Sequence, residues 1–473
     1  MRLHTLLRGR SFAVAGFRSQ ANNCQRLLRR TLRRLKSTTS APSGVVEEQI
    51  MQPVRTNANL HMARWLYGCC GMVFGMVALG GITRLTGSGL SMVEWKPTGI
   101  LPPTTKEGWE EEFNKYKSFP EYQKHNDELS LAEFKWIWFM EWGHRMAGRA
   151  TGMVFGIPLL YFGMRGMIPK RLAPRMAGLL LLGGSQGLIG WWMVRSGLND
   201  KERFGGEGRV SPYRLAAHLS MAFILYTALF NTAIGLSTAH KVANMSPSAR
   251  LYAQALIEKV PASLRIGSVG LASLVGLTAF SGAFVAGNHA GMVYDEFPTM
   301  GGKLLPDDIV NPFLEPKWRN IFEHDTMVQW NHRVLAMTTL GAVTSMYLAS
   351  LRLPLPSNAR VASHLMMAMS TVQVSLGIST LLLHVPVPLA SAHQMGSLTL
   401  LTLSLWFAHT LRPLAPVSVA SAARTAATAT SGRTSAALLL AAGGASTAAT
   451  KFFGESDPDV QSANDDEKEL ERS

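Results

Sequence analysis

Residues 133–149 read Glu133-Phe-Lys-Trp-Ile-Trp-Phe-Met-Glu141-Trp-Gly-His144-Arg145-Met-Ala-Gly148-Arg149. They open an apolar run that continues to Phe162, which predicts the outer end of a membrane-spanning helix. Glu141 and His144 stand three residues apart and therefore share one face of that helix. Ionisable side chains inside a span are costly and usually face an interior site. A hydrogen-bonded packing histidine is the alternative interpretation.

The composition of the whole chain also indicates a membrane protein. Its 473 residues are 47% hydrophobic and only 16% charged, which is too apolar for an ordinary soluble protein of this length. Eight apolar runs are each long enough to span, so we expect an all-α membrane protein with eight transmembrane helices. The runs cover residues 65–83, 134–163, 176–195, 213–237, 266–287, 326–350, 361–384 and 387–410.

The two ends of the chain differ from this apolar region. Residues 1–46 hold nine Arg, one Lys and no acid, which resembles a mitochondrial transit peptide. An arm that binds nucleic acid is the alternative, but a polytopic membrane domain follows, so we expect no nucleic-acid partner. Residues 413–473 are rich in Ala, Ser and Thr and end in many charges. We expect this low-complexity tail to be disordered.

The charges of the connecting segments predict the orientation. The segment from 84 to 133 has nine acids and six bases, whereas the connections after the second, fourth and sixth runs are basic and hold one acid. The N-terminus and the basic connections should therefore face the mitochondrial matrix, and the long segments the intermembrane space. Four tryptophans are expected at the outer membrane boundary as an aromatic belt: Trp136, Trp138, Trp191 and Trp192.

The two halves of the apolar region repeat each other in four motifs. Four helices in each half make an even number of crossings, so we predict two tandem four-helix bundles in parallel orientation, over residues 60–240 and 262–412. The matches are Glu141-Trp-Gly-His144-Arg145 with Gln329-Trp-Asn-His332-Arg333, Gln186-Gly-Leu-Ile-Gly190 with Gln373-Val-Ser-Leu-Gly377, Ala217-His218 with Ala392-His393, and 81–97 with 282–298.

The repeat supplies one histidine near the outer end of each even-numbered run. Imidazole is a strong iron ligand, and two imidazoles from facing helices can hold a b-type haem without covalent attachment. We therefore predict two iron sites, His144 with His218 and His332 with His393. A small residue follows each histidine by four positions, where a flat macrocycle needs room: Gly148, Ala222, Ala336 and Ser397. His289 and His324 are kept as further candidates because they stand in outer segments near the second pair.

The halves differ at one chemically important position. Glu141 precedes the first histidine by three residues, where Gln329 precedes its counterpart. A carboxylate beside one haem and an amide beside the other indicates proton-coupled chemistry at the first site and electron transfer alone at the second. Neutral drift between the repeats is the alternative.

With these motifs in view, the sequence resembles the haem A synthase family in its mitochondrial form. The resemblance covers about residues 60–412 and includes ordered matches much longer than the histidine motifs. They are Gly80-Gly-Ile-Thr-Arg-Leu-Thr-Gly-Ser-Gly-Leu-Ser91, Trp95-Lys-Pro-Thr-Gly-Ile-Leu-Pro-Pro103, Gln186-Gly-Leu-Ile-Gly-Trp-Trp-Met-Val-Arg-Ser-Gly197, Tyr213-Arg-Leu-Ala-Ala-His218, Gly282-Ala-Phe-Val-Ala-Gly287 and Leu389-Ala-Ser-Ala-His-Gln-Met-Gly-Ser397.

The resemblance implies a reaction, successive hydroxylation of the C8 methyl of haem O to the formyl of haem A, for cytochrome c oxidase. It implies that His144 and His218 hold the substrate haem and that His332 and His393 hold a haem b that relays electrons. Glu141 would be the catalytic proton acceptor or positioning group. Arginine forks suit haem propionates, with lipid head groups as the alternative partners. The candidates for this contact are Arg145 and Arg333, and further Arg84 and Arg214.

The leader and the resemblance together imply a multi-pass protein of the mitochondrial inner membrane, with haem sites toward the intermembrane space. A ferredoxin and its reductase would supply electrons; haem O synthase and oxidase assembly factors are further candidate partners, beside membrane lipid, and a homo-oligomer is left open. Two rival functions also remain open. A dihaem b-type electron-transfer cytochrome predicts that Glu141→Gln changes little, and a haem chaperone or transporter for oxidase assembly predicts release of unmodified haem.

Overall fold

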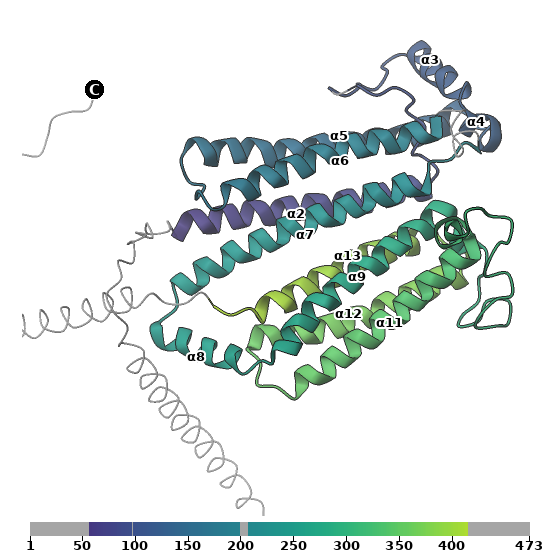
Figure 1. The fold of residues 1–473 in the computed structure, drawn as a ribbon. Helices are drawn as coiled ribbons and strands as arrows, with labels where there is room; N and C mark the ends of the chain where they lie inside the picture. The colour runs from purple at the N-terminus through teal and green to yellow at the C-terminus, as the bar shows by residue number, and fades with distance from the viewer. Residues whose placement is uncertain (1–55, 97, 199–206, 415–473) are drawn as a thin grey trace, which may run out of the picture. The chain divides into compact units, whose positions relative to one another are not determined.

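The computed structural model describes residues 56–96, 98–198 and 207–414. The leader predicted over 1–46 and the tail beyond residue 414 lie outside this part of the chain. The described helices belong to one unit that ends at Pro413. The long helices are α2 (Thr56–Leu85), α5 (Leu131–Met164), α6 (Ala173–Leu198), α7 (Pro212–Ala243), α9 (Ala262–Asn288), α11 (Asp325–Leu351), α12 (Ser357–Leu382) and α13 (Val387–Thr410) (Figure 1). The short ones are α3 (Lys106–Lys117), α4 (Pro120–His125), α8 (Pro247–Glu258) and α10 (Asn320–Glu323), with the 3-10 turns η2 (Ala290–Met292) and η3 (Lys317–Arg319).

The secondary structure confirms the all-α class for the described residues, which contain no β-strand. Each apolar run expected from the sequence falls on one of the long helices. Six described helices, α2, α6, α7, α9, α11 and α12, are long and apolar enough to cross a membrane by length and composition. α5 and α13 have 34 and 24 residues, and polar residues such as Arg149 and Gln394 lower their mean hydropathy.

The main packing contacts form two similar sets. In the first set α2 packs against α5 and α7, and α6 packs against α7; in the second, α9 packs against α11 and α13, and α12 packs against α13. The two sets meet through α2 with α13 and α7 with α9. Hydrogen bonds between hydroxyls join neighbouring helices, Tyr226 with Thr402 at 2.9 Å and Thr278 with Thr339 at 2.7 Å. Such bonds stabilise helix pairs in lipid, where water cannot compete.

The outer helices turn apolar side chains away from the rest of the protein. Ile157 on α5 is 66% exposed and Leu181 on α6 is 73% exposed. An apolar side chain exposed at mid-helix would be unfavourable in water, since burial of such a side chain is worth about 1.5–3 kcal/mol. These surfaces therefore suit contact with lipid acyl chains.

The segment between α2 and α5 has a small core of its own, which the sequence did not predict. Trp109, Phe113 and Tyr116 of α3 pack against Phe134 and Trp138 at the start of α5. Ser130 caps α5 in a capping box with Glu133, and Thr105 accepts a hydrogen bond from the Gly108 amide at the start of α3, so both helices begin at defined residues.

This small core corrects the expectation for Trp138, which is fully buried beside Trp109 and does not face lipid. The remaining residues of the expected belt, Trp136, Trp191 and Trp192, are exposed. Trp138 is drawn inward because α3 folds back over the start of α5 and covers that face.

Glu121 on α4 is buried beside this core, where its carboxylate accepts a hydrogen bond from the Tyr116 hydroxyl at 3.0 Å. Burial raises the pKa of Glu121 to about 8, and the charge of Glu141 adds to this rise, whereas the Tyr116 hydrogen bond and Arg84 oppose it. The folded state thus binds a proton that the unfolded state has released. The free energy of unfolding should therefore fall as pH rises from about 4.5 to about 8.

We predict that Glu121→Gln removes most of this pH dependence, because a glutamine stays neutral at every pH. The melting temperature of the purified protein in detergent should exceed that of the wild type most at pH 8 and least near pH 5. Glu128→Gln, which changes an exposed carboxylate in the same segment, should leave the wild-type slope unchanged. Equal slopes for Glu121→Gln and the wild type would contradict the assignment.

Candidate functional site

Each of the four predicted histidines lies against a glycine of a neighbouring helix. A Cβ atom built on Gly80 of α2 would lie 2.9 Å from Cε1 of His144, and one on Gly190 of α6 would lie 2.9 Å from Cε1 of His218. The same contact recurs in the second set of helices. There the pairs are Gly282 of α9 with His332, at 3.0 Å, and Gly377 of α12 with His393, at 2.8 Å. No side chain larger than hydrogen fits at these positions without moving the imidazole.

Hydrogen bonds to Nδ1 orient the two rings of the second pair. Nδ1 of His332 is 2.8 Å from the Ser281 hydroxyl. Nδ1 of His393 is 3.2 Å from the backbone carbonyl oxygen of Gln373, and the Gln373 side-chain amide donates to the His393 backbone carbonyl oxygen at 2.9 Å. In the first pair, Nδ1 of His144 and of His218 is buried without a partner among the described residues. A partner on Nδ1 fixes the tautomer and leaves Nε2 to bind a metal.

The rings of His332 and His393 are spaced as two ligands of one metal ion. Their centroids are 6.4 Å apart and their planes are nearly perpendicular, at 85°. Two imidazole nitrogens on opposite sides of a first-row metal, each at about 2 Å, put the ring centroids roughly 6 Å apart.

Two imidazoles do not complete a metal site alone. In the described part of the chain, no group of three or more His, Cys, Asp or Glu side chains could hold a metal ion. A planar tetrapyrrole supplies four ligands of its own and needs only axial nitrogens from the protein. The donors and the glycine contacts therefore fit a haem held by two histidines.

Glu141 lies on α5 beside His144 but binds other partners. Its Oε2 accepts hydrogen bonds from the Ser91 hydroxyl and the Met92 amide, each at 2.8 Å, and its Oε1 pairs with Arg145 at 2.6 Å. No hydrogen bond joins Glu141 to His144 among the described residues. The carboxylate is only 3% exposed, so it holds the segment after α2 against α5.

The two predicted arginines have matching positions. Arg145 donates to the carbonyl oxygens of Met92 and Glu94, both at 2.8 Å. Arg333 donates to the carbonyl oxygens of Thr299 at 2.9 Å and Tyr294 at 3.3 Å. Each guanidinium therefore fastens the outer segment of its own half.

The partner of the arginine differs between the halves. Gln329 also donates to Tyr294, at 2.9 Å, whereas its Oε1 is buried without a partner. Only the first half combines the arginine with a buried carboxylate.

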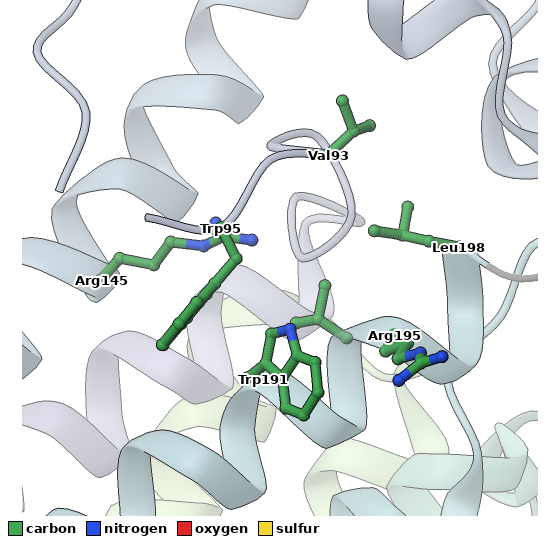
Figure 2. A pocket seen from close by; sticks show the side chains of 7 residues that line it. Val93, Trp95, Arg145, Trp191, Arg195 and Leu198 are labelled. Atoms are coloured by element: carbon green, nitrogen blue, oxygen red, sulfur yellow. The ribbon is translucent and has the colours of Figure 1, made fainter. Parts of the chain in front are cut away.

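A cavity of about 420 Å³ lies between the C-terminal part of α6, α5 and the segment that follows α2 (Figure 2). Two guanidinium groups and two indoles line it, together with aliphatic side chains. The Arg195 guanidinium lies over the Trp191 ring, 5.6 Å from its centroid, and Trp95 is 6.1 Å from the same ring system. The lining residues are Val93, Trp95, Arg145, Trp191, Val194, Arg195 and Leu198.

The other candidate residues have partners away from the four histidines. Nε2 of His289 is 2.6 Å from the Arg84 guanidinium, and His324 is 2.6 Å from the carbonyl oxygen of Asp308. Arg214 donates to the Trp192 carbonyl oxygen at 2.9 Å. The Nε2 lone pair of His289 is thus occupied by Arg84 and not directed at a metal.

The glycines that contact the rings were not predicted from the sequence. The predicted small residues stand four positions after each histidine, on the same helix, whereas the contacts come from neighbouring helices. The Gln186–Gly190 and Gln373–Gly377 repeat contained the signal for α6 and α12. For α2 the repeat matched Gly81 with Gly282, but the residue that contacts His144 as Gly282 contacts His332 is Gly80. The structural equivalence between α2 and α9 is therefore shifted by one residue from the sequence match.

These features define a multi-pass helical membrane protein in which four histidines lie against glycines of neighbouring helices. The cytochrome oxidase assembly protein model (COX15-CtaA) matches residues 63–405, and the chain belongs to this family.

Curated relatives agree over most of the chain. It is 45% identical to "Heme A synthase COX15" of Bos taurus over 80% of this chain and 85% of the relative. It is 47% identical to "Heme A synthase COX15" of Arabidopsis thaliana, over 74% of this chain and 75% of the relative. It is also 44% identical to "Heme A synthase" of Nitrosospira multiformis, over 74% and 93%.

We predict that Glu141→Ala lowers the free energy of unfolding by about 3–5 kcal/mol, because Arg145 is left buried without its counter-charge. Ser91→Ala, which removes one hydrogen bond to the same carboxylate, should cost about 1 kcal/mol. Denaturant titration in detergent measures both. Glu111→Ala, which breaks an exposed pair with Lys115, is the control and should change little. A Glu141→Ala variant as stable as this control would show that the buried pair does not hold the segment.

Proposed function

We propose that this chain is a haem A synthase, an enzyme that oxidises a methyl group of haem O to the formyl group of haem A. Family membership and the similarity to relatives of that name support the assignment. The geometry supports it through one observation above all. His332 and His393 face each other at 6.4 Å, the spacing at which two imidazoles hold one haem iron.

The ligand assignment follows the two sets of helices. His332 and His393 bind a resident haem b, and His144 and His218 bind the substrate haem. The hydrogen bonds on Nδ1 of the second pair suit a permanently bound group, because they fix both rings before the haem arrives. The first pair has no such bonds, and its rings can adjust to a haem that enters and leaves.

The architecture behind this assignment is two tandem four-helix bundles, over residues 60–240 and 262–412, with eight transmembrane helices. The matching contacts of α2, α5, α6 and α7 with those of α9, α11, α12 and α13 support the repeat. The four glycine–histidine contacts support it further, because they follow the same order in both halves. α5 and α13 span as well, although their hydropathy alone is too low, because their polar residues face the interior.

The cavity in the first half supports placing the substrate there. By the 187-residue repeat, Trp191 and Arg195 correspond to Ile378 and Leu382 in the second half, so the indole and guanidinium that these two residues supply are replaced there by aliphatic side chains. Carboxylates pair well with guanidinium groups. Arg195 and Arg145 accordingly contact the propionates of the substrate haem, and Arg333, whose buried Nε lacks a partner, contacts those of the resident haem.

A bound haem supplies the redox chemistry, and the chain positions it. Glu141 keeps Arg145 and the segment after α2 in place next to His144. Two donors occupy its Oε2 and one occupies its Oε1, so Oε1 keeps an acceptor site for a proton. The buried surroundings of the carboxylate keep bulk water from competing for it.

The same function sets the location and partners that we propose. The chain lies in the mitochondrial inner membrane, with its N-terminus in the matrix and the haem sites toward the intermembrane space. A ferredoxin and its reductase supply electrons, and haem O synthase and oxidase assembly factors are candidate neighbours.

Haem extraction from cells that express this chain with a haem O supply tests the function. We expect haem A from the wild type. In Glu141→Gln both haems should remain bound, but formation of the formyl group should fall by about 10²-fold or more, with the hydroxymethyl haem accumulating. A wild type that yields only unmodified haem would identify a carrier or a dihaem cytochrome instead, and full haem A from Glu141→Gln would remove the catalytic role of the carboxylate.

The glycine contacts give a second test, which assigns each haem to its half. Gly377→Ala should lose the haem b spectrum of the purified protein, because the new methyl displaces His393. Gly190→Ala should keep that spectrum but weaken binding of added haem O. Alanine is otherwise the better helix former by about 1 kcal/mol, so losses cannot come from the helix. Gly187→Ala, with open space at its Cβ, should resemble the wild type. If all three variants bind haem equally well, the histidines at these glycine contacts are not haem ligands.

A further inference from the structure

One half-buried side chain, that of Gln394, joins the two halves beside both histidine pairs. The Gln394 side-chain amide on α13 donates to the carbonyl oxygen of Val77 on α2 at 3.0 Å. Its carboxamide occupies the space left by Gly81, where an added Cβ atom would lie 2.9 Å from Cδ of Gln394. The contact links residues 317 apart in the sequence.

Both ends of this contact are adjacent to predicted iron ligands. Gln394 directly follows His393. On α2, Gly81 directly follows Gly80, which lies against the ring of His144. A continuous path therefore runs from His393 through one side chain and two glycines of α2 to His144.

The equivalent crossing between α7 and α9 is apolar. By the repeat, Leu219, which follows His218, corresponds to Gln394. Leu219 packs against a cluster that contains Ala283, the residue after Gly282. A polar contact is thus present where α13 packs against α2 and absent where α7 packs against α9, among the described residues. It connects the helix of His393 with the first half.

We propose that Gln394 is a positioning residue that fixes the separation of the two haem sites and carries the shortest electron route from the second site to the first. The inference rests on the proposed function. Its physical basis is that an amide between membrane helices has little water to bind, so it holds its carbonyl partner and with it the register of α13 along α2. Leucine, of similar size, would fill the space without fixing the register.

The test uses the full-length protein with haem b in the second site and haem A added to the first, since the formyl group separates their absorption bands. After a flash from a soluble ruthenium photoreductant, we follow electron equilibration between the two bands. Gln394→Leu and Gly81→Ala should retain both haems but equilibrate at least tenfold more slowly than the wild type. Gly75→Ala, on the same helix with open space at its Cβ, should equilibrate at the wild-type rate.

A double variant separates packing from the hydrogen bond. Gly81→Ala/Gln394→Ala should recover the thermal stability lost in Gly81→Ala, because the clash is gone, yet remain slow in equilibration, because the amide is gone. Wild-type equilibration in Gln394→Leu and Gly81→Ala with both haems bound would overturn the role of Gln394 and leave the proposed function intact. Failure of the wild type to form haem A would instead overturn the proposed function.

Discussion

The close contact between an imidazole ring and the bare backbone of a neighbouring helix is the constraint on which the rest of this structure depends. A glycine at each of the four contacts lets a histidine-bearing helix approach its neighbour until the ring touches the main chain. Helices in lipid have no hydrophobic force to pull them together and associate through such close packing. One contact therefore both joins a helix pair and orients a side chain, which explains why the same pattern occurs in both halves.

The two halves use different chemistry on this shared frame. In the first, a buried carboxylate, a guanidinium and a backbone amide hold the outer segment together. In the second, an amide and a guanidinium share the Tyr294 carbonyl oxygen instead. A buried ion pair costs more to assemble than an amide contact, because both charges lose their hydration. Its retention in one half alone is consistent with the proposed division between a site that exchanges its haem and one that keeps it.

The sequence predicted the helices and the four histidines because both leave a periodic signal. Apolar runs fix where helices cross the membrane, and the repeat singles out His144, His218, His332 and His393 among thirteen histidines. It did not predict the partners of Glu141, since Ser91 and Met92 reach it only when the segment after α2 folds back over α5. The prediction that Trp138 lies in the aromatic belt was wrong for a related reason, because α3 covers this side chain. The sequence match paired Gly81 with Gly282, one position away from Gly80, which makes the equivalent contact. Matching residue types cannot fix the rotation of one helix against another.

The link between Arg84 and His289 has a consequence for the outer ends of α2 and α9. His289 ends α9 in a left-handed conformation, with φ of 57°, which turns its ring toward Arg84. Burial, with the charges of Arg84, Arg209 and His125, lowers the pKa of His289 to about 4. Nε2 of His289 therefore stays unprotonated, and accepts from the Arg84 guanidinium, at pH values well above 4. The hydrogen bond that joins the C-terminal ends of α2 and α9 is therefore insensitive to pH across the neutral range.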